Sequence, residues 1–126
     1  MIFDPDSPKP IYMQLADWLE IEILNGRFAT DEKVYSQYQL AEMFDINPAT
    51  AAKGLNRLVE EGILYKKRGL GMFVTEEAKE KIWRKRKSET LKRLMIELVV
   101  EAKRLDVKIE QLLEMVRDVY EREVKS

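Results

Sequence analysis

The sequence contains neither cysteine nor histidine, and these two absences narrow the chemistry open to the chain. There is no thiol nucleophile, and the usual ligand set of a zinc site is missing. Histidine is also the side chain that most often performs general acid–base catalysis. Pairs of carboxylates remain as catalytic groups, but almost nothing in the sequence supports a small hydrolase built on them. We therefore expect a protein that is not an enzyme and that carries no metal or cofactor.

Long apolar runs are absent as well. No run approaches the roughly 20 residues that cross a membrane. The first residues, Met1 to Asp6, lack the basic and apolar regions of a signal peptide. We therefore expect a cytoplasmic protein with no membrane partner. Its 126 residues suffice for one domain with a core plus an appendage.

Two short helices joined by a tight turn are predicted near the middle of the chain. Ser36 and Gln39 have the spacing of a capping box at the start of the first helix. Asn47 is a good N-cap for the second helix, and Pro48 occupies the first helical position, where proline is best tolerated. Gly62 ends this second helix.

Each of these helices has one apolar face, because its apolar residues recur every three or four positions. They are Leu40, Ala41 and Phe44 in the first helix and Ala51, Leu55 and Leu58 in the second. The two faces pack together only if the helices cross steeply, which is the geometry of a helix-turn-helix. The second helix would then enter a DNA major groove with its outward side chains. These are Ala49, Ala52, Lys53 and Asn56.

A β-hairpin is predicted directly after the helix-turn-helix, over residues 63–74. Two short apolar runs surround a basic loop that contains Gly69 and Gly71. A hairpin in this place is the wing of a winged helix. Residues 33–35 are a possible short strand that could pair with it.

An N-terminal helix is predicted to form the floor of the core. It begins at Pro10 and ends at Gly26. Its apolar residues recur every four positions and are Ile11, Leu15, Leu19 and Ile23.

Acidic and basic residues nearly balance, which gives a net charge of −1, but they are unevenly distributed along the chain. Residues 1–47 contain three basic and nine acidic side chains, whereas residues 48–75 contain five basic and two acidic ones. The local field matters more than the total charge for binding a polyanion. The positive charge therefore lies on the second helix of the pair and on the wing, where phosphates would lie.

Several linked motifs occur in order between residues 9 and 75. They are Pro10-Ile11-Tyr12-x-Gln14-Leu15, Ser36-x-x-x-Leu40-Ala41, Ile46-Asn47-Pro48-Ala49-Thr50, Leu58-x-x-x-Gly62-Ile63-Leu64 and Gly69-x-Gly71-x-Phe73-Val74. Together they resemble the winged-helix DNA-binding domain of GntR-type bacterial transcription regulators. The Asn-Pro-Ala-Thr turn and the short tail resemble the YtrA branch of that family, whose members resemble repressors of neighbouring transporter genes.

The sequence also departs from that family. The family arginine that contacts DNA from the helix after Ser36 is replaced by Tyr38, and the arginines often found on the recognition helix are replaced by Pro48 and Ala52. Base readout is therefore expected to rest on Asn47, Ala49, Thr50, Lys53 and Asn56, with modest specificity in each half-site. The full set of expected DNA-binding residues is Ser36, Gln37, Tyr38, Gln39, Asn47, Ala49, Thr50, Lys53, Asn56, Arg57, Lys66, Lys67, Arg68, Gly69 and Gly71.

The tail is predicted to be a hairpin of two helices with a break near residues 106–108. The basic run at residues 79–93 fits either a solvated linker helix or a further patch for phosphates or an acidic partner. Apolar stripes on both helices would leave a patch larger than monomers usually expose, so we expect a homodimer. The expected interface residues are Leu91, Leu94, Met95, Leu98, Val99, Ile109, Leu112, Leu113 and Val116. The alternative is that the stripes pack on the winged domain of their own chain.

We therefore expect a mostly α-helical fold with a small β-hairpin. A winged helix-turn-helix DNA-binding domain would occupy residues 1–75, and a helical hairpin for dimerisation would occupy residues 76–126. The expected function is that of a dimeric repressor that binds an inverted-repeat operator in double-stranded DNA. The hairpin is too small to enclose a metabolite, so any effector would bind between subunits or between the tail and the winged domain.

A protein–protein adaptor built on a winged helix is the alternative function. The acidic residues 1–47 and the missing arginines favour it. Basic residues on both DNA-facing elements argue against it, because an adaptor does not need them.

Overall fold

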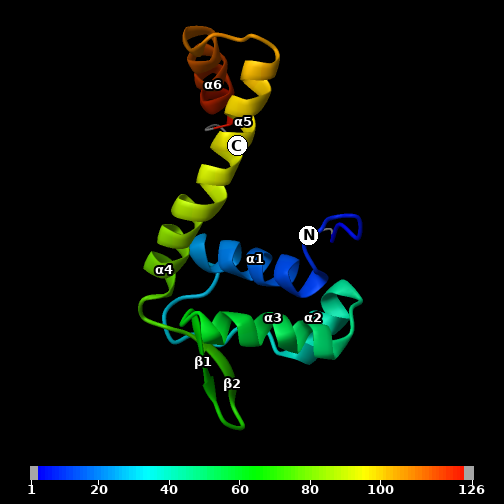
Figure 1. Cartoon of the computed structure of the whole chain (residues 1–126). Helices are drawn as coiled ribbons and strands as arrows, with labels where there is room; N and C mark the ends of the chain where they lie inside the picture. The colour runs from blue at the N-terminus through cyan, green and yellow to red at the C-terminus, as the bar shows by residue number, and fades with distance from the viewer. Residues whose placement is uncertain (1–2, 124–126) are drawn as a thin grey trace. The chain divides into compact units, whose positions relative to one another are not determined.

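The computed structural model describes residues 3–123. The chain divides into two compact units, Met1–Lys85 and Arg86–Ser126. The first unit contains α1 (Ile11–Leu24), α2 (Gln37–Phe44), α3 (Pro48–Glu60), β1 (Leu64–Lys67), β2 (Gly71–Val74) and α4 (Ala78–Lys85) (Figure 1). The second contains the π-helical segment η1 (Arg86–Leu91), α5 (Lys92–Arg104) and α6 (Ile109–Glu123). The predicted fold class, a winged helix-turn-helix followed by a helical hairpin, is confirmed.

The caps of the helix-turn-helix form as the sequence predicts. Ser36 Oγ accepts a hydrogen bond from the Gln39 amide at 3.1 Å, and Gln39 Oε1 accepts one from the Ser36 amide at 2.8 Å. Asp45 ends α2 with a left-handed φ of 53°. Asn47 Oδ1 then accepts from the Ala49 amide at 2.8 Å, and α3 begins at Pro48. Because each end is capped locally, the turn between α2 and α3 is short.

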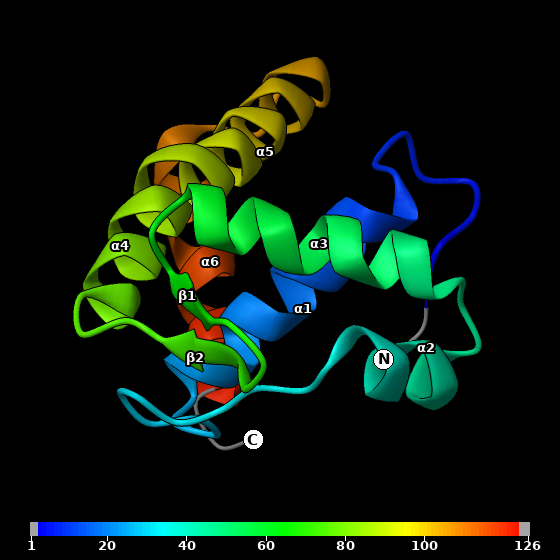
Figure 2. The same ribbon diagram turned by 90° about the horizontal axis from the view of Figure 1, so that it is seen from below.

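The core of the first unit lies between α1, α2 and α3, and α3 packs against both other helices (Figure 2). Leu15, Leu19 and Ile23 of α1 are buried in it, as the predicted four-residue repeat requires. Gly54 allows α3 to approach α1 closely, because a Cβ atom at this position would lie 2.9 Å from the Tyr12 carbonyl oxygen. This close approach brings the N-terminal helix up against the recognition helix.

The wing is held to the rest of the unit by the segment that precedes α2. In the antiparallel hairpin, Leu64 of β1 pairs with Val74 of β2. Lys33 forms an isolated β-bridge with Phe73, and the Val34 amide donates to the Met72 carbonyl at 2.9 Å. The expected pairing of residues 33–35 with the wing is therefore confirmed.

Helix α4 belongs to the first unit, which extends ten residues beyond the expected boundary at residue 75. The reason is that α4 contributes to the core. Ala78 is 1% exposed, Ile82 is fully buried, and both lie in the same apolar cluster as the residues of α1 and α3. The separate second unit therefore starts at Arg86 rather than at residue 76.

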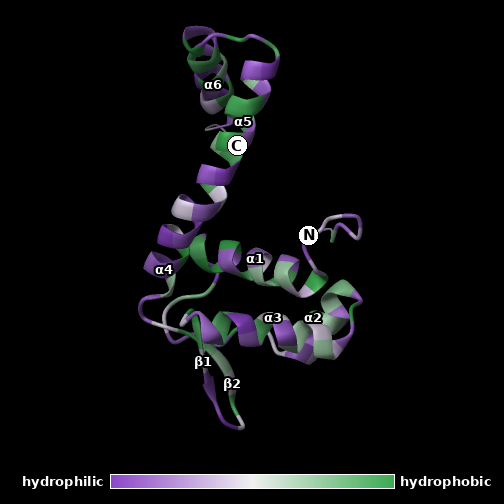
Figure 3. Ribbon diagram, viewed as in Figure 1, coloured by the Kyte–Doolittle hydropathy of each residue, from purple (hydrophilic) through white to green (hydrophobic). Residues whose placement is uncertain are grey.

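The second unit is a helical hairpin with little core of its own. The chain reverses after Arg104, where Asp106 has a φ of 58° and the Val107 amide donates to the Ala102 carbonyl at 2.8 Å. Ala102 and Leu112 are buried beside this turn. The remaining expected interface residues are 41–57% exposed, and apolar positions recur along α5 and α6 (Figure 3). These are Leu91, Leu94, Met95, Leu98, Val99, Ile109, Leu113 and Val116.

Within the described residues, no helix is both long enough and apolar enough to cross a bilayer.

Candidate nucleic-acid interface

The outward face of α3 forms a hollow of about 530 Å³. It is lined by Tyr12, Gln37, Ala49, Ala52, Lys53, Asn56, Arg57 and Glu60. Six of these residues lie on α3, and they include all four of the outward residues predicted for that helix. Gln37 joins them from α2. Thr50 is half-buried and does not line the hollow.

Tyr12 also lines this hollow, although it was not among the expected DNA-binding residues. The Lys53 Nζ atom lies 4.3 Å from the centroid of the Tyr12 ring, which is within the range of a cation–π contact. This contact holds the Lys53 ammonium group over α1 while the lysine side chain stays exposed. The only sequence signal for Tyr12 was its place in the Pro10–Leu15 motif, because a contact across 41 residues leaves no local pattern.

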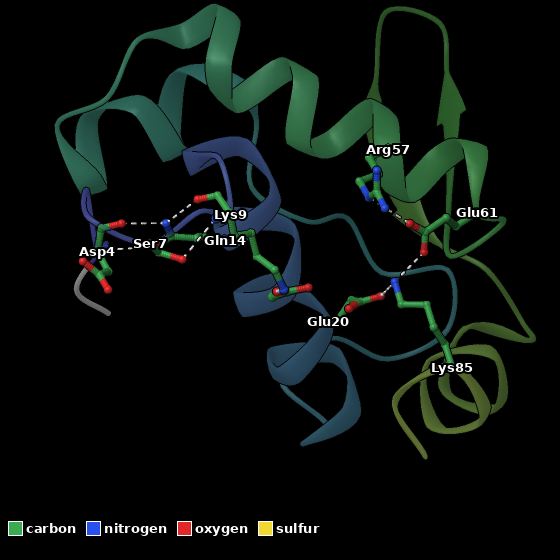
Figure 4. Close-up of polar contacts among 9 residues, drawn as sticks. Asp4, Ser7, Lys9, Gln14, Glu20, Arg57, Glu61 and Lys85 are labelled. Atoms are coloured by element: carbon green, nitrogen blue, oxygen red, sulfur yellow. Dashed lines mark hydrogen bonds and ion pairs between the residues drawn. The ribbon is translucent and has the colours of Figure 1, made fainter. Parts of the chain in front are cut away.

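Arg57 is held by an acidic neighbour. Its Nε atom lies 3.2 Å from Glu61 Oε1, and 41% of its side chain is exposed. Glu61 Oε2 also lies 2.6 Å from Lys85 Nζ, and the same Nζ lies 2.5 Å from Glu20 Oε2 (Figure 4). Sequence reasoning did not find this chain of charges, because its members come from α1, the end of α3 and α4.

Burial dominates the titration of the most enclosed member, Glu20, which is 0% exposed. Burial raises the pKa of Glu20, and the hydrogen bond and charge of Lys85 oppose that rise only in part. Burial by itself would lower the pKa of Lys85, but hydrogen bonds to Glu20 and Glu61, together with their charges, raise it instead. Lys85 is therefore held as a cation between the two carboxyl groups.

Fewer of the side chains expected to bind DNA around α2 and the turn are available for that role, because several of them cap the helices. Ser36 and Gln39 bind each other's backbone amides in the capping box, and the side-chain oxygen of Asn47 caps α3. These three residues therefore fix the ends of the helices. Tyr38 is 69% exposed and Gln37 lines the hollow, so of the residues expected on α2 these two keep side chains available to a ligand.

The wing presents a basic, exposed tip. Lys66, Lys67, Arg68 and Gly69 are all exposed. Gly69 and Gly71 have φ values of 78° and 126°, which side chains rarely adopt, so glycine is required at both ends of the tip. Lys67 Nζ lies 4.8 Å from the Phe73 ring centroid, which keeps this cation over β2.

Lys33 adds a further cation to the wing. A Cβ atom at Gly71 would lie 2.8 Å from Lys33 Cε, so the lysine side chain passes directly over this glycine. In sequence, Lys33 lies in the acidic first part of the chain, and the backbone pairing of its segment with β2 brings it to the wing.

Comparison with known proteins identifies the first unit. The sequence pattern described as "Bacterial regulatory proteins, gntR family" matches residues 11–74, from the start of α1 to the end of β2. The HTH-type transcriptional repressor NagR of Bacillus subtilis is 38% identical over 76 residues, which are 60% of this chain and 31% of NagR. The HTH-type transcriptional repressor YtrA of the same organism is 30% identical over 116 residues, which are 92% of this chain and 88% of YtrA. The chain thus spans less than a third of NagR but most of YtrA.

Solved structures that resemble this chain also include regulators of this kind. A GntR family transcriptional regulator from Listeria monocytogenes superposes with a TM-score of 0.77 at 29% identity, covering 92% of this chain and 98% of that one. The DNA-binding domain of AraR in complex with operator ORX1 gives a TM-score of 0.55 at 28% identity, covering 60% of this chain and 93% of that one. The relatives are regulators rather than enzymes, as expected. The chain belongs to the gntR family of bacterial regulatory proteins.

Proposed function

We propose that this chain is a sequence-specific DNA-binding transcription regulator that acts as a dimeric repressor on an inverted-repeat operator. The observation that carries the proposal is that exposed cations lie on both elements that a winged helix applies to DNA. Lys53 and Arg57 line the hollow on α3, and the basic triplet 66–68 is exposed on the wing. Phosphate contacts supply much of the affinity of such proteins.

In this proposal α3 enters the major groove and the wing follows the adjacent backbone. Ala49 and Ala52 are small, so the helix can approach the base edges closely and contact thymine methyl groups. Asn56 and Lys53 are the polar side chains of suitable chemistry for adenine and guanine edges. Few side chains read bases, so each half-site provides limited specificity.

The relatives support this function. NagR and YtrA are named transcriptional repressors, and the AraR domain was solved in complex with its operator. The similarity to YtrA covers 88% of that protein, so it includes most of the second unit as well as the first. We extend the proposal to an operator near transporter genes, on the resemblance to the YtrA branch, and to the cytoplasm, where bacterial DNA lies.

Dimerisation would make this binding effective. The exposed apolar residues of α5 and α6 form a surface that a second copy of the chain would cover. Two joined winged units would engage two half-sites at a high effective concentration. We assign the interface to the exposed members of the expected set. Leu112 is left out of this assignment, because it is already 7% exposed within a single chain.

A salt titration of DNA binding tests the proposed function. The affinity of the full chain for duplex DNA should fall steeply with salt, by about 0.9 log units per log unit of salt for each phosphate contacted. Replacing Lys66, Lys67 and Arg68 by glutamine should reduce this slope, whereas Lys103→Gln in α5 should leave it unchanged. A protein–protein adaptor would show no salt-dependent binding to DNA in either form.

A further inference from the structure

Glu61 is shared between two cations that come from different helices. Its Oε1 atom lies 3.2 Å from Arg57 Nε on α3, and its Oε2 atom lies 2.6 Å from Lys85 Nζ on α4. Figure 4 shows both side chains directed at this one carboxylate. The Glu61 side chain is 24% exposed, so both interactions are partly shielded from water.

A buried acid fixes Lys85 in this position. Glu20 is fully buried on α1, and its Oε2 atom lies 2.5 Å from Lys85 Nζ. Acidic and basic side chains therefore alternate along a chain of contacts: Glu20, Lys85, Glu61 and Arg57. Of the two bases, Lys85 is the more enclosed, with 28% of its side chain exposed against 41% for Arg57.

We propose that Lys85 is a positioning residue for DNA binding, which neutralises Glu61 and thereby allows Arg57 to leave that carboxylate for a DNA phosphate. The inference rests on the proposed function and adds to it that Arg57, at the edge of the hollow on α3, contacts a DNA phosphate. A carboxylate that already has one cation in place attracts a second cation less strongly than a carboxylate that has none. Without Lys85, Glu61 would compete more strongly with the phosphate for Arg57.

The Lys85–Glu61 contact also lies at the junction between α4 and the next helical segment. Lys85 is the last residue of α4, and the π-helical segment η1 starts at the next residue. Segments of π-helix often mark functional sites. Any event that draws Lys85 away from Glu61 would strengthen the hold of Glu61 on Arg57 and so weaken DNA binding. The end of α4 is thereby coupled to the DNA-facing surface of α3.

The test is a set of variants in one common background. All variants carry Glu20→Gln, because removing Lys85 beside an ionised buried carboxylate would cost stability. Lys79→Gln is the matched control, since it removes the same charge from an exposed position on the same helix. Binding of each full-length variant to a mixed-sequence duplex of about 30 base pairs, which spans two half-sites, is measured by fluorescence anisotropy.

Lys85→Gln should weaken binding about three- to fivefold more than Lys79→Gln, the range expected for a partly exposed ion pair. This excess should disappear when Glu61→Gln is added, because the competing carboxylate is gone. It should also disappear in the Arg57→Gln background. Lys85→Arg should bind like the parent, since it keeps the cation, and circular dichroism checks that each variant is folded.

Equal losses for Lys85→Gln and Lys79→Gln would overturn the inference. So would an excess that persists with Arg57→Gln, because Lys85 would then act on DNA directly or through the fold. A Lys85→Arg variant as weak as Lys85→Gln would also contradict it. If the parent protein failed to bind the duplex in a salt-dependent way, the proposed function would fall, and this inference with it.

Discussion

Lys53 and Arg57 lie one turn apart on α3, and their neighbours predict different roles in DNA binding. Lys53 is exposed above the Tyr12 ring, on the face of α3 that we propose meets base edges, whereas Arg57 lies beside Glu61. Lys53→Ala should therefore cost about 1–3 kcal/mol on the preferred operator and much less on random DNA. Arg57→Ala should weaken both alike and reduce the salt slope by about one. Titrations of both DNAs measure this, and equal losses for Lys53→Ala on the two would contradict the assignment.

Glu20 gives the stability of the first unit a distinctive pH dependence. Its pKa is raised by burial from an ordinary value of 4.5, while Glu61 and Asp17 add to the rise and Lys85 opposes it. The folded state therefore keeps the proton at pH values where the unfolded chain has lost it. The resulting stabilisation is complete below pH 4.5 and is lost as the pH rises through the folded pKa.

Glu20→Gln removes this titration. Urea unfolding at a series of pH values should show the free energy of unfolding of the wild type falling relative to that of Glu20→Gln as the pH rises above 4.5. The difference between the two proteins isolates Glu20 from the other carboxyl groups. A constant difference across this range would show that the Glu20 pKa is the same in both states.

Among the elements, the wing carries a prediction of its own. Its tip is exposed, and the left-handed glycines at 69 and 71 allow a narrow turn that could approach a minor groove. Arginine is favoured where A·T tracts narrow that groove and deepen its negative potential. Arg68→Ala should therefore lose the preference for A·T-rich flanks in competition binding with A·T-rich and G·C-rich duplexes. A ratio equal to that of the wild type would mean that the wing contacts only phosphates.

The elements that sequence could predict are those fixed by local signals. The capping box of Ser36 and Gln39, the N-cap at Asn47 and the glycine-flanked wing each depend on residues a few positions apart. The contacts that sequence did not reveal are long-range. The Tyr12–Lys53 contact, the Glu20–Lys85 pair and the packing of α4 into the first core join distant segments, and no periodicity records them. The π-helical η1 also lacks a sequence signal in an otherwise ordinary helical pattern.

At the scale of the whole molecule, the prediction concerns assembly. Leu98 is 44% exposed on the apolar stripe of α5, and a second copy would bury it. Leu98→Lys should give a monomer by sedimentation at micromolar concentration and lose operator affinity about a hundredfold or more, because the two winged units are no longer joined. Ile96→Lys is the control, since Ile96 is exposed on α5 away from the stripe. A wild type that sediments as a monomer would favour packing of the stripes on their own chain.

Selection of genomic DNA fragments by the full-length protein tests the central proposal most directly. The retained fragments are sequenced and compared with those retained by Lys53→Ala. A dimeric, sequence-specific regulator should enrich a short inverted repeat whose half-sites are separated by about one helical turn or a multiple of it. The Lys53→Ala protein should lose that enrichment while still retaining DNA at low salt. Retention of fragments with no common sequence would contradict sequence-specific binding. Equal enrichment by both proteins would contradict the role of Lys53 in reading bases.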